Sequence, residues 1–558
     1  MPGVRDLSDS FHERWLLTHP FAASTYGIPG YDDRVPDASE SGEAARRSEL
    51  ESVRAETERL DPSALSEADA VTLGCLREYI ADEMRGLDVR LVEHTVTAMP
   101  FSGPAVLLAT AARTVLADER AADDYLERLR GGATWVDQQS ERLRIGAGKG
   151  RLPVAPLVQQ AIEWAERVLE PAVPTALATA QPPEGWDGEP AWREERDALA
   201  GGVVKPALAR WVELLRELLP RARSADEPGL VHLPGGDADY ALCVESSTTL
   251  PVTPEEIHRI GLEELEAFEQ RALELGARLG LRSLPEIHQA LREASVSRPP
   301  AEAMEAATAA IRRAEARAGE FFSPPLPPPC DMTPMPTVVA SSGVAPHYTP
   351  PRLDGGRPGT FWFNLERPTA GAGWDVESVA FHEGVPGHHL QLSRVQMLDQ
   401  LPAMQRQRSL TVYAEGWALY AEQLAEEMGL YPDTESLLGA LAQSLMRAAR
   451  LVVDTGLHAL GWSRREALEF VVAHVPNPEP FLANEIDRYI VMPGQALSYL
   501  IGKREVVRLR DEASRRLGGD FTLPEFHAVM LDSGSLPLPV LADKVRRWQG
   551  TGDEPTSS

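Results

Sequence analysis

Apolar residues recur every three or four positions along most of this chain, among alanine, glutamate and arginine. That spacing places them on one face of an α-helix, and the residues between them favour helix. We therefore expect a mainly α-helical fold. The pattern predicts helices over Ala44–Leu60, Glu67–Arg85, Asp118–Ile145, Leu157–Leu169, Ala191–Leu219, Thr253–Leu279, Gln405–Met428, Glu435–Leu460, Arg464–His474 and Ala483–Leu517, the last interrupted at Pro493-Gly494.

One region departs from the helical pattern. Between Thr337 and Leu365 the runs "TVVASS" and "TFWFNL" are rich in β-branched and aromatic residues, which is typical of strands. They predict a small β-sheet at about residues 337–365. If Thr360–Leu365 forms the edge of that sheet, it could hold an extended peptide by main-chain hydrogen bonds.

Composition and charge exclude several classes of function. The 558 residues carry a formal net charge of −29, which disfavours nucleic acid and anionic membranes, because both call for a basic surface. The first twenty residues lack a basic segment followed by an apolar run, and no eighteen consecutive residues are apolar, so neither a secretory signal nor a membrane-spanning helix is expected. The three cysteines form no C-x-x-C pair. We expect a cytoplasmic protein.

The stretch "FHEGVPGHHLQ", from Phe381 to Gln391, begins as a zinc-protease helix does, with His-Glu. The usual signature is H-E-x-x-H, in which two histidines one turn apart grip one ion. Here position i+4 is Pro386, and His388 and His389 follow. On a straight helix His389 would lie about 10 Å beyond His382. A straight helix therefore cannot bring these side chains to one metal.

A break at Pro386-Gly387 would remove this difficulty. Proline lacks the N–H and its ring crowds the carbonyl group four residues earlier, that of His382, whereas glycine adopts backbone angles that other residues avoid. With two residues looped out, His388 returns toward His382, so we favour His388 as the second ligand. His389 is the alternative ligand, or else a substrate contact. The other interpretation is a helix-capping turn with surface histidines and no metal.

A third ligand is expected on the helix "SLTVYAEGWALYAEQLAEEMGL". Glu415 lies 27 residues after His388, which leaves room for a turn and an antiparallel helix. Gly416 costs about 1 kcal/mol inside a helix and so indicates the close approach of another element, for which we expect the metal-binding helix. Glu415 and Glu422 could instead form a solvated stripe, although the flanking aromatic residues argue against this for Glu415.

Four segments, "FHEGVPGHHLQ", "YAEGWALYAE", "VVDTGLHALGW" and "EIDRYIVMPGQALSYLIG", resemble a bacterial family known as domain of unknown function 885, over most of the chain. The arrangement is similar to that of gluzincin metallopeptidases such as thimet oligopeptidase and angiotensin-converting enzyme, although H-E-x-x-H is absent. The resemblance implies a large two-lobed helical fold. We expect an N-terminal helical lobe (1–235), a metal-bearing lobe (236–550) with the small sheet next to the metal helix, and a short polar tail (551–558) that is disordered.

Further residues are candidates for catalysis and binding. Glu383 directly follows the first ligand and is the expected general base. Tyr489 and Arg488 could stabilise an oxyanion, or Arg488 could bind a substrate carboxylate, or it could simply pair with Glu485 three residues earlier. Candidates for substrate binding are His389, Asp454 and His458, which are four residues apart on one helix face, and His347-Tyr348 in the loop between the two predicted strands.

These features predict a zinc-dependent peptidase with one Zn²⁺ per chain, held by His382, His388 and Glu415, that cleaves short peptides. A metal-dependent amidohydrolase acting on a non-peptide amide would use the same roles. A non-catalytic helical binding protein is the contrasting possibility.

Overall fold

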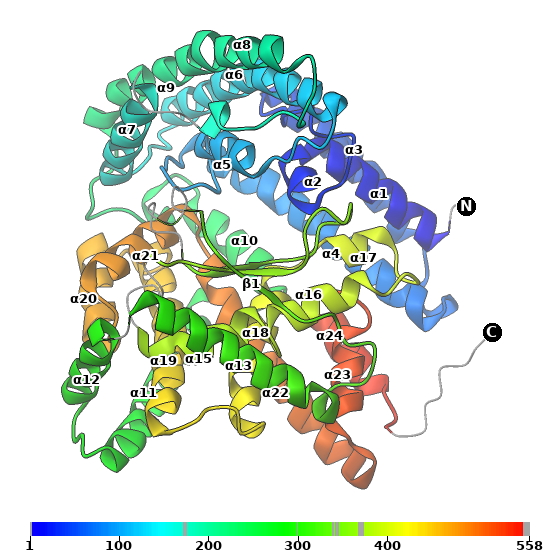
Figure 1. Cartoon of the computed structure of the whole chain (residues 1–558), viewed down its shortest axis with the longest axis vertical. Helices are drawn as coiled ribbons and strands as arrows, with labels where there is room; N and C mark the ends of the chain where they lie inside the picture. The colour runs from blue at the N-terminus through cyan, green and yellow to red at the C-terminus, as the bar shows by residue number, and fades with distance from the viewer. Residues whose placement is uncertain are drawn as a thin grey trace.

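The computed structural model describes residues 3–170, 176–297, 299–336, 340, 345–366 and 373–550. Over these residues the protein is mainly α-helical, as predicted, with one small three-stranded sheet. The sheet crosses the middle of the molecule, with one group of helices above it and a larger helical body below it (Figure 1). The predicted C-terminal tail lies outside the described residues.

Two groups of helices come from the first part of the chain. The first group is α1 (Val4–Thr18), α2 (Pro20–Tyr26), α3 (Glu40–Glu58) and α4 (Glu67–Val89). The second forms the top of the molecule in Figure 1 and comprises α5 (Ala105–Arg113), α6 (Glu119–Gly148), α7 (Ala155–Leu169), α8 (Glu189–Leu199) and α9 (Lys205–Leu218).

The remaining helices build the body around the sheet. Before the sheet come α10 (Gly236–Thr248), α11 (Pro254–Arg278), α12 (Leu284–Ser297) and α13 (Pro300–Phe321). After it come α15 (Val376–Glu383), α16 (His388–Gln396), α17 (Ala403–Gln407), α18 (Thr411–Glu427), α19 (Thr434–His458), α20 (Arg464–His474), α21 (Glu479–Val491), α22 (Ser498–Leu517), α23 (Leu523–Leu531) and α24 (Leu538–Arg547).

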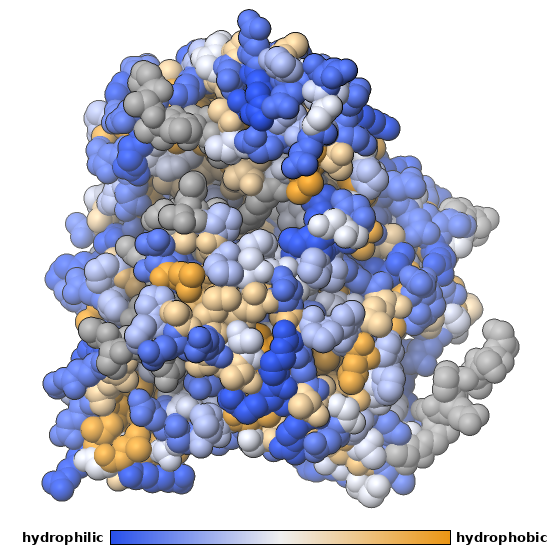
Figure 2. All heavy atoms as spheres, in the orientation of Figure 1, coloured by the Kyte–Doolittle hydropathy of each residue, from blue (hydrophilic) through white to orange (hydrophobic). Residues whose placement is uncertain are grey.

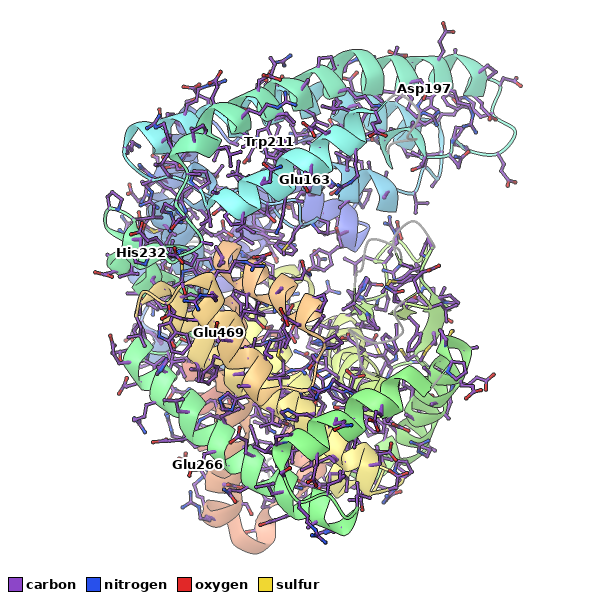
Figure 3. All side chains as sticks on the ribbon, turned by 90° about the vertical axis from the view of Figure 1, so that its left-hand side faces the viewer. Glu163, Asp197, Trp211, His232, Glu266 and Glu469 are labelled. Carbon is purple, nitrogen blue, oxygen red and sulfur yellow. The ribbon has the colours of Figure 1, made fainter. Side chains whose placement is uncertain are left out.

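The buried apolar residues gather into separate cores. One core lies wholly within the upper helices, between Val96 and Leu218. The largest core joins side chains of α1, α3 and α4 to side chains of α13, α15, α18 and the C-terminal helices. The N-terminal helices therefore pack into the body, and the predicted boundary at residue 235 does not separate two independent cores. Figure 3 shows the upper layer, with Trp211 on α9, lying over the body that carries Glu266 and Glu469, with His232 at the side where the two meet.

The sheet has the order β1-β3-β2. Strand β1 (Asp331–Pro334) pairs in parallel with β3 (Thr360–Phe363), and β2 (His347–Thr349) pairs with β3 in antiparallel fashion. The strand predicted from "TFWFNL" is confirmed, but it is the central strand, so the prediction that it forms the edge is wrong. The strand predicted from "TVVASS" lies mostly outside the described residues.

Two predicted helices are interrupted where tertiary contacts or a proline intervene. Between α8 and α9 a π-helical segment spans Ala200–Val204, because Pro206 has no N–H to donate to the carbonyl group four residues earlier. Between α17 and α18 the chain breaks at Arg408, whose guanidinium lies against Trp15 and Tyr79 and hydrogen-bonds to Glu83 at 3.1 Å. The N–H of Leu410, left without a helical partner by this break, donates to the hydroxyl oxygen of Ser535 at 2.8 Å.

Helix α19 runs through the centre of the body. By length and composition it alone, among the helices described, could cross a membrane, but 83% of its most apolar stretch is buried inside the protein. The face of the molecule in Figure 2 is largely hydrophilic with scattered apolar side chains. The structure thus uses α19 as a core helix.

Gly416 marks a close helix contact, as predicted, but its partner is α22 and not the metal-binding helix. A Cβ atom at Gly416 would lie 2.6 Å from the main chain of Gly502, and one at Gly502 would lie 2.1 Å from the carbonyl oxygen of Val412. Two glycines facing one another let the backbones of α18 and α22 approach this closely. The contact fixes α22 one residue away from Glu415.

We expect Gly416→Ala to destabilise the protein by about 1–3 kcal/mol, because the methyl group must displace main chain that cannot yield easily. The matched control is Gly86→Ala in α4, where a Cβ atom meets nothing within 4 Å. That substitution should stabilise the protein by up to about 1 kcal/mol through helix propensity. Urea unfolding of the three proteins measures both effects, and equal stabilities of the two variants would contradict the packing argument.

Candidate functional site

The chain between His382 and His388 breaks as the sequence predicts. Helix α15 ends at Glu383, and α16 begins at His388. Gly387 lies against the end of α15 so closely that a Cβ atom there would be 1.9 Å from the carbonyl oxygen of His382. The indole Nε1 of Trp417, on α18, donates to the carbonyl oxygen of Pro386 at 3.0 Å. The break is therefore held in place from α18.

The break brings two imidazoles and a carboxylate together. His382 Nε2 lies 3.3 Å from Glu415 Oε2, and His388 Nε2 lies 3.5 Å from the same oxygen. The two imidazole rings are perpendicular, with centroids 4.9 Å apart. One ligand atom from each of the three residues lies within 4.8 Å of the others.

His389 points elsewhere. Its Nδ1 lies 3.1 Å from the hydroxyl group of Tyr348, and its Nε2 lies 2.8 Å from the carbonyl oxygen of Pro328. Both ring nitrogens are thus occupied on the side of the sheet, and burial lowers the pKa of this imidazole. Of the two adjacent histidines, His388 joins the cluster. The alternative assignment of His389 as ligand or substrate contact is not compatible with this position.

A buried carboxylate supports His382 from behind. Glu422 Oε1 accepts from His382 Nδ1 at 2.8 Å, and Glu422 Oε2 accepts from the hydroxyl group of Ser378 at 2.8 Å. Burial disfavours the imidazolium, but the hydrogen bonds to Glu415 and Glu422 outweigh it and raise the pKa of His382 to about 9. With Nδ1 held in this way, Nε2 faces Glu415.

The carboxylate of Glu415 faces the two imidazoles of the cluster. Burial by itself would raise its pKa, but the charge of His388 and the hydrogen bond from His382 hold it well below the usual range. Its Oε2 is buried, and its nearest donors are the two imidazoles, at 3.3 and 3.5 Å, whereas His388 Nδ1 is buried without a partner among the described residues. The side chains of His388 and Glu415 remain 12% and 20% exposed, so the cluster is reached from solvent.

Glu383 stands beside the cluster, between the first ligand and the sheet. Its Oε2 accepts from the backbone N–H of Tyr348 at 2.8 Å, and its charge contributes to the raised pKa of His382. The bond to β2 ties this carboxylate to the edge strand of the sheet. The small sheet therefore lies next to the helix that carries His382, as predicted, and contacts it directly.

Arg488 and Tyr489 are both bound to Glu485 and not to the candidate metal ligands. Arg488 forms two hydrogen bonds with Glu485, at 2.9 and 2.8 Å, and Tyr489 donates to the same carboxylate at 2.7 Å. The pairing of Arg488 with Glu485, foreseen as an alternative, is the one present. Tyr489 is 1% exposed, which excludes the predicted role of its hydroxyl group as an oxyanion donor in this conformation.

The other predicted binding residues serve the fold. Asp454 accepts from Tyr240 and from the N–H of Gly494, whereas His458 bridges Leu230 N–H and the carbonyl oxygen of Tyr489; Asp454 and His458 are both fully buried. Burial lowers the pKa of His458 to about 4. The prediction that this pair contacts substrate is therefore wrong.

His347 and Tyr348 lie on β2 and not in a loop. The ring of Tyr348 packs edge-on against His389, and its hydroxyl group lies 2.9 Å from that of Ser393. His347 Nδ1 lies 3.0 Å from the carbonyl oxygen of Ala345. Of these two residues, Tyr348 contacts the site, and it does so through its main-chain N–H, which binds Glu383. Its side chain lies instead against His389 and Ser393.

Comparison with known proteins agrees with the resemblance seen in the motifs. Residues 20–545 match the model of a family described as bacterial protein of unknown function (DUF885). The chain belongs to this family. No curated protein matches it.

Two solved structures share the fold of this DUF885 protein. One is described as "the putative lipoprotein from Colwellia psychrerythraea", with 25% identity, a TM-score of 0.88 and 98% coverage of each chain. The other is described as "a putative lipoprotein of unknown function from Shewanella oneidensis", with 14% identity, a TM-score of 0.73, and coverage of 97% of this chain and 99% of that one. These descriptions contradict the expected cytoplasmic location, because lipoproteins are anchored to a membrane or exported.

Two residues near the cluster were not predicted as site residues. Glu422 was considered only as part of a solvated stripe with Glu415, seven residues earlier, but it is buried and bonded to His382. Tyr499, on α22, is partly exposed, and burial together with the Glu415 charge raises the pKa of its hydroxyl group. Its position depends on the contact between α18 and α22, which the sequence does not reveal.

The charge on His382 predicts a pH dependence in chelator-treated protein. Because the folded pKa, about 9, exceeds the ordinary 6.5, the imidazolium stabilises the fold fully below pH 6.5, and this contribution disappears as the pH rises through 9. We expect the free energy of unfolding to fall by about 3 kcal/mol more between pH 6 and 9.5 than in His382→Gln. Urea unfolding at both pH values measures the difference, and parallel pH profiles would contradict the paired imidazolium.

Proposed function

We propose that this protein is a zinc-dependent hydrolase that cleaves short peptides, with a gluzincin-like site. The observation that carries the proposal is the convergence of His382 Nε2, His388 Nε2 and Glu415 Oε2. Two imidazoles and one carboxylate are a common ligand set of catalytic zinc, which leaves one position for water or substrate.

The residues fit a zinc ion in spacing and in chemistry. Ligands about 2.1 Å from a tetrahedral ion lie about 3.4 Å from one another, close to the 3.3 and 3.5 Å that separate Glu415 Oε2 from the two histidines. Glu422 occupies the other nitrogen of His382, as carboxylates do behind zinc-bound histidines. Mixed histidine and glutamate ligation suits zinc among the common metals.

When bound, zinc would polarise the substrate carbonyl group and make water more acidic. In the proposed reaction Glu383 accepts a proton from the attacking water and passes it to the amine that leaves. The water oxygen joins the carbonyl carbon, the C–N bond breaks, and the two products are an acid and an amine. The bond from Tyr348 N–H keeps the Glu383 carboxylate oriented between the first ligand and β2.

A peptide substrate is favoured over a non-peptide amide by the edge strand. The order β1-β3-β2 leaves β2 at one edge, and β2 contacts Glu383 directly. An extended peptide can pair with such an edge through its main chain. Because Glu383 already holds the Tyr348 N–H, the peptide would donate its own N–H to a carbonyl oxygen of β2. This pairing would place a peptide bond beside the general base, whatever the side chains of the peptide.

The ligand assignment predicts different outcomes for the two adjacent histidines. After incubation with zinc and dialysis, wild-type protein and His389→Gln should each retain one zinc per chain, whereas His388→Gln should retain far less. Metal analysis by mass spectrometry measures this. Zinc retained by His388→Gln and lost from His389→Gln would reverse the assignment, and no zinc in any of the three would favour a binding protein without metal.

The base assignment predicts that Glu383→Gln binds zinc normally but cleaves a peptide library at least about 100-fold more slowly, since general base catalysis contributes about 10²–10⁴-fold. The matched control is Glu427→Gln on α18, where the carboxylate pairs with Arg510 near the surface. That variant should cleave as fast as wild type. Full activity in Glu383→Gln would remove the residue from the mechanism.

A further inference from the structure

Helix α19 presents a buried polar stripe toward the site. Four residues follow one another at intervals of four, three and four positions, so they share one face of the helix: Gln443, Arg447, Arg450 and Asp454. Arg447 lies 3.8 Å from Glu422, the carboxylate behind His382. Arg450 is less than one turn further along, about 4.5 Å of helix rise. The stripe thus leads from the carboxylate behind His382 to Glu485 on α21.

At Arg450 the stripe meets a charged cluster whose charges do not balance. Arg450 Nη2 donates to Glu485 Oε2 at 2.9 Å, and Arg488 donates twice to the same carboxylate. Among the described residues, Glu485 is the carboxylate that hydrogen-bonds to either guanidinium. Two guanidinium groups share this one hydrogen-bonded carboxylate, so one positive charge has no bonded anion, in a chain whose formal charge is −29.

The cluster also contains an unused donor. Arg450 is 8% exposed, and its Nη1 is buried without a hydrogen-bond partner, which costs free energy for a charged group. Arg488 uses its own Nη1 to donate to Gln495 at 2.6 Å. The side chains of Arg450 and Arg488 keep 10% and 15% exposure, so the cluster borders solvent. An anion that reached Arg450 would supply both the missing acceptor and the missing charge.

Tyr499 connects this cluster to the metal ligands. The guanidinium of Arg450 lies 4.5 Å from the centre of its ring. Tyr499 lies three residues before Gly502 on α22, and Gly502 packs against Gly416, the neighbour of Glu415. Tyr499 therefore stands on the part of α22 that adjoins both Arg450 and the segment of α18 that carries Glu415. An anion bound at the cluster could therefore belong to the same short peptide whose peptide bond lies at the metal ligands.

We propose that the Arg450–Arg488 cluster binds the free α-carboxylate of the peptide substrate, so that the protein removes residues from the carboxyl end of short peptides. The inference rests on the proposed function and adds which end of the peptide substrate the enzyme cleaves. A guanidinium N–H donates a strong, charge-assisted hydrogen bond to a carboxylate, and Arg450 Nη1 is the donor left for it. The local positive charge overrides the acidic character of the whole chain for this one group.

The first test compares peptides of identical sequence with a free or an amidated carboxyl terminus. We expect the zinc-loaded enzyme to cleave the free acid with a kcat/KM at least about 30-fold higher, mostly through KM. An amidated peptide with glutamate as its last residue should behave like the other amides, which distinguishes the α-carboxylate from an acidic side chain. Equal cleavage of acid and amide, or rescue by glutamate, overturns the inference and leaves the proposed function intact, whereas cleavage of neither peptide removes both.

The second test assigns the effect to the cluster. Arg450→Gln leaves Glu485 paired with Arg488, so the protein should still fold and bind zinc, but the preference for the free acid should fall to within about twofold. The matched control is Arg464→Gln on α20, whose partner Asp487 lies on α21, as Glu485 does, but outside the cluster. It should keep the full preference, and an unchanged preference in Arg450→Gln would overturn the assignment.

A binding measurement that does not depend on turnover completes the design. In the Glu383→Gln background, calorimetry should show the free-acid peptide binding at least about tenfold more tightly than its amide, and Arg450→Gln should abolish that difference. Equal affinities of acid and amide in the Glu383→Gln protein would overturn the inference even if Arg450→Gln alone failed to fold.

Discussion

The candidate site depends on one steric contact, between the backbone of Gly387 and the end of helix α15. Because Gly387 has no side chain, its Cα can lie against the carbonyl oxygen of His382, where a Cβ atom would be 1.9 Å away. This contact allows α16 to start beside α15 instead of continuing it. His388 therefore faces His382 across the break, although a straight helix would carry it away to the side.

The site is then completed by helices that come from later in the chain. Helix α18 supplies Glu415 to the two imidazoles, Glu422 to the back of His382 and the Trp417 bond that holds the break. The facing glycines of α18 and α22 set Tyr499 near Glu415. The position of each group thus depends on backbone packing between helices, so small residues at the contacts matter as much as the polar residues themselves.

Charge is distributed unevenly around this centre. The imidazoles of His382 and His388 lie among Glu383, Glu415 and Glu422, which favours a cation there. Three arginines line the adjoining side of α19 and α21, and among the described residues their carboxylate partners are Glu422 and Glu485; the arginines are Arg447, Arg450 and Arg488. A site that polarises a carbonyl group and also holds an anion nearby needs such a separation. The acidic surface of the whole protein does not conflict with it, because these arginines act at short range in partly dry surroundings.

The sequence alone determined the helical class, most helix positions, the break after His382 and the three candidate ligands, because periodicity, proline and glycine act locally. Helix α20 has the predicted bounds, Arg464–His474. Tertiary structure decided what depends on neighbours distant in the chain. It turned His389 to Tyr348 and Pro328, buried Asp454 and His458 in structural bonds, made Thr360–Phe363 the central strand and joined the N-terminal helices to the body's core. The residue type determines what a side chain can bind, but its partner is decided only when segments far apart in the chain pack together.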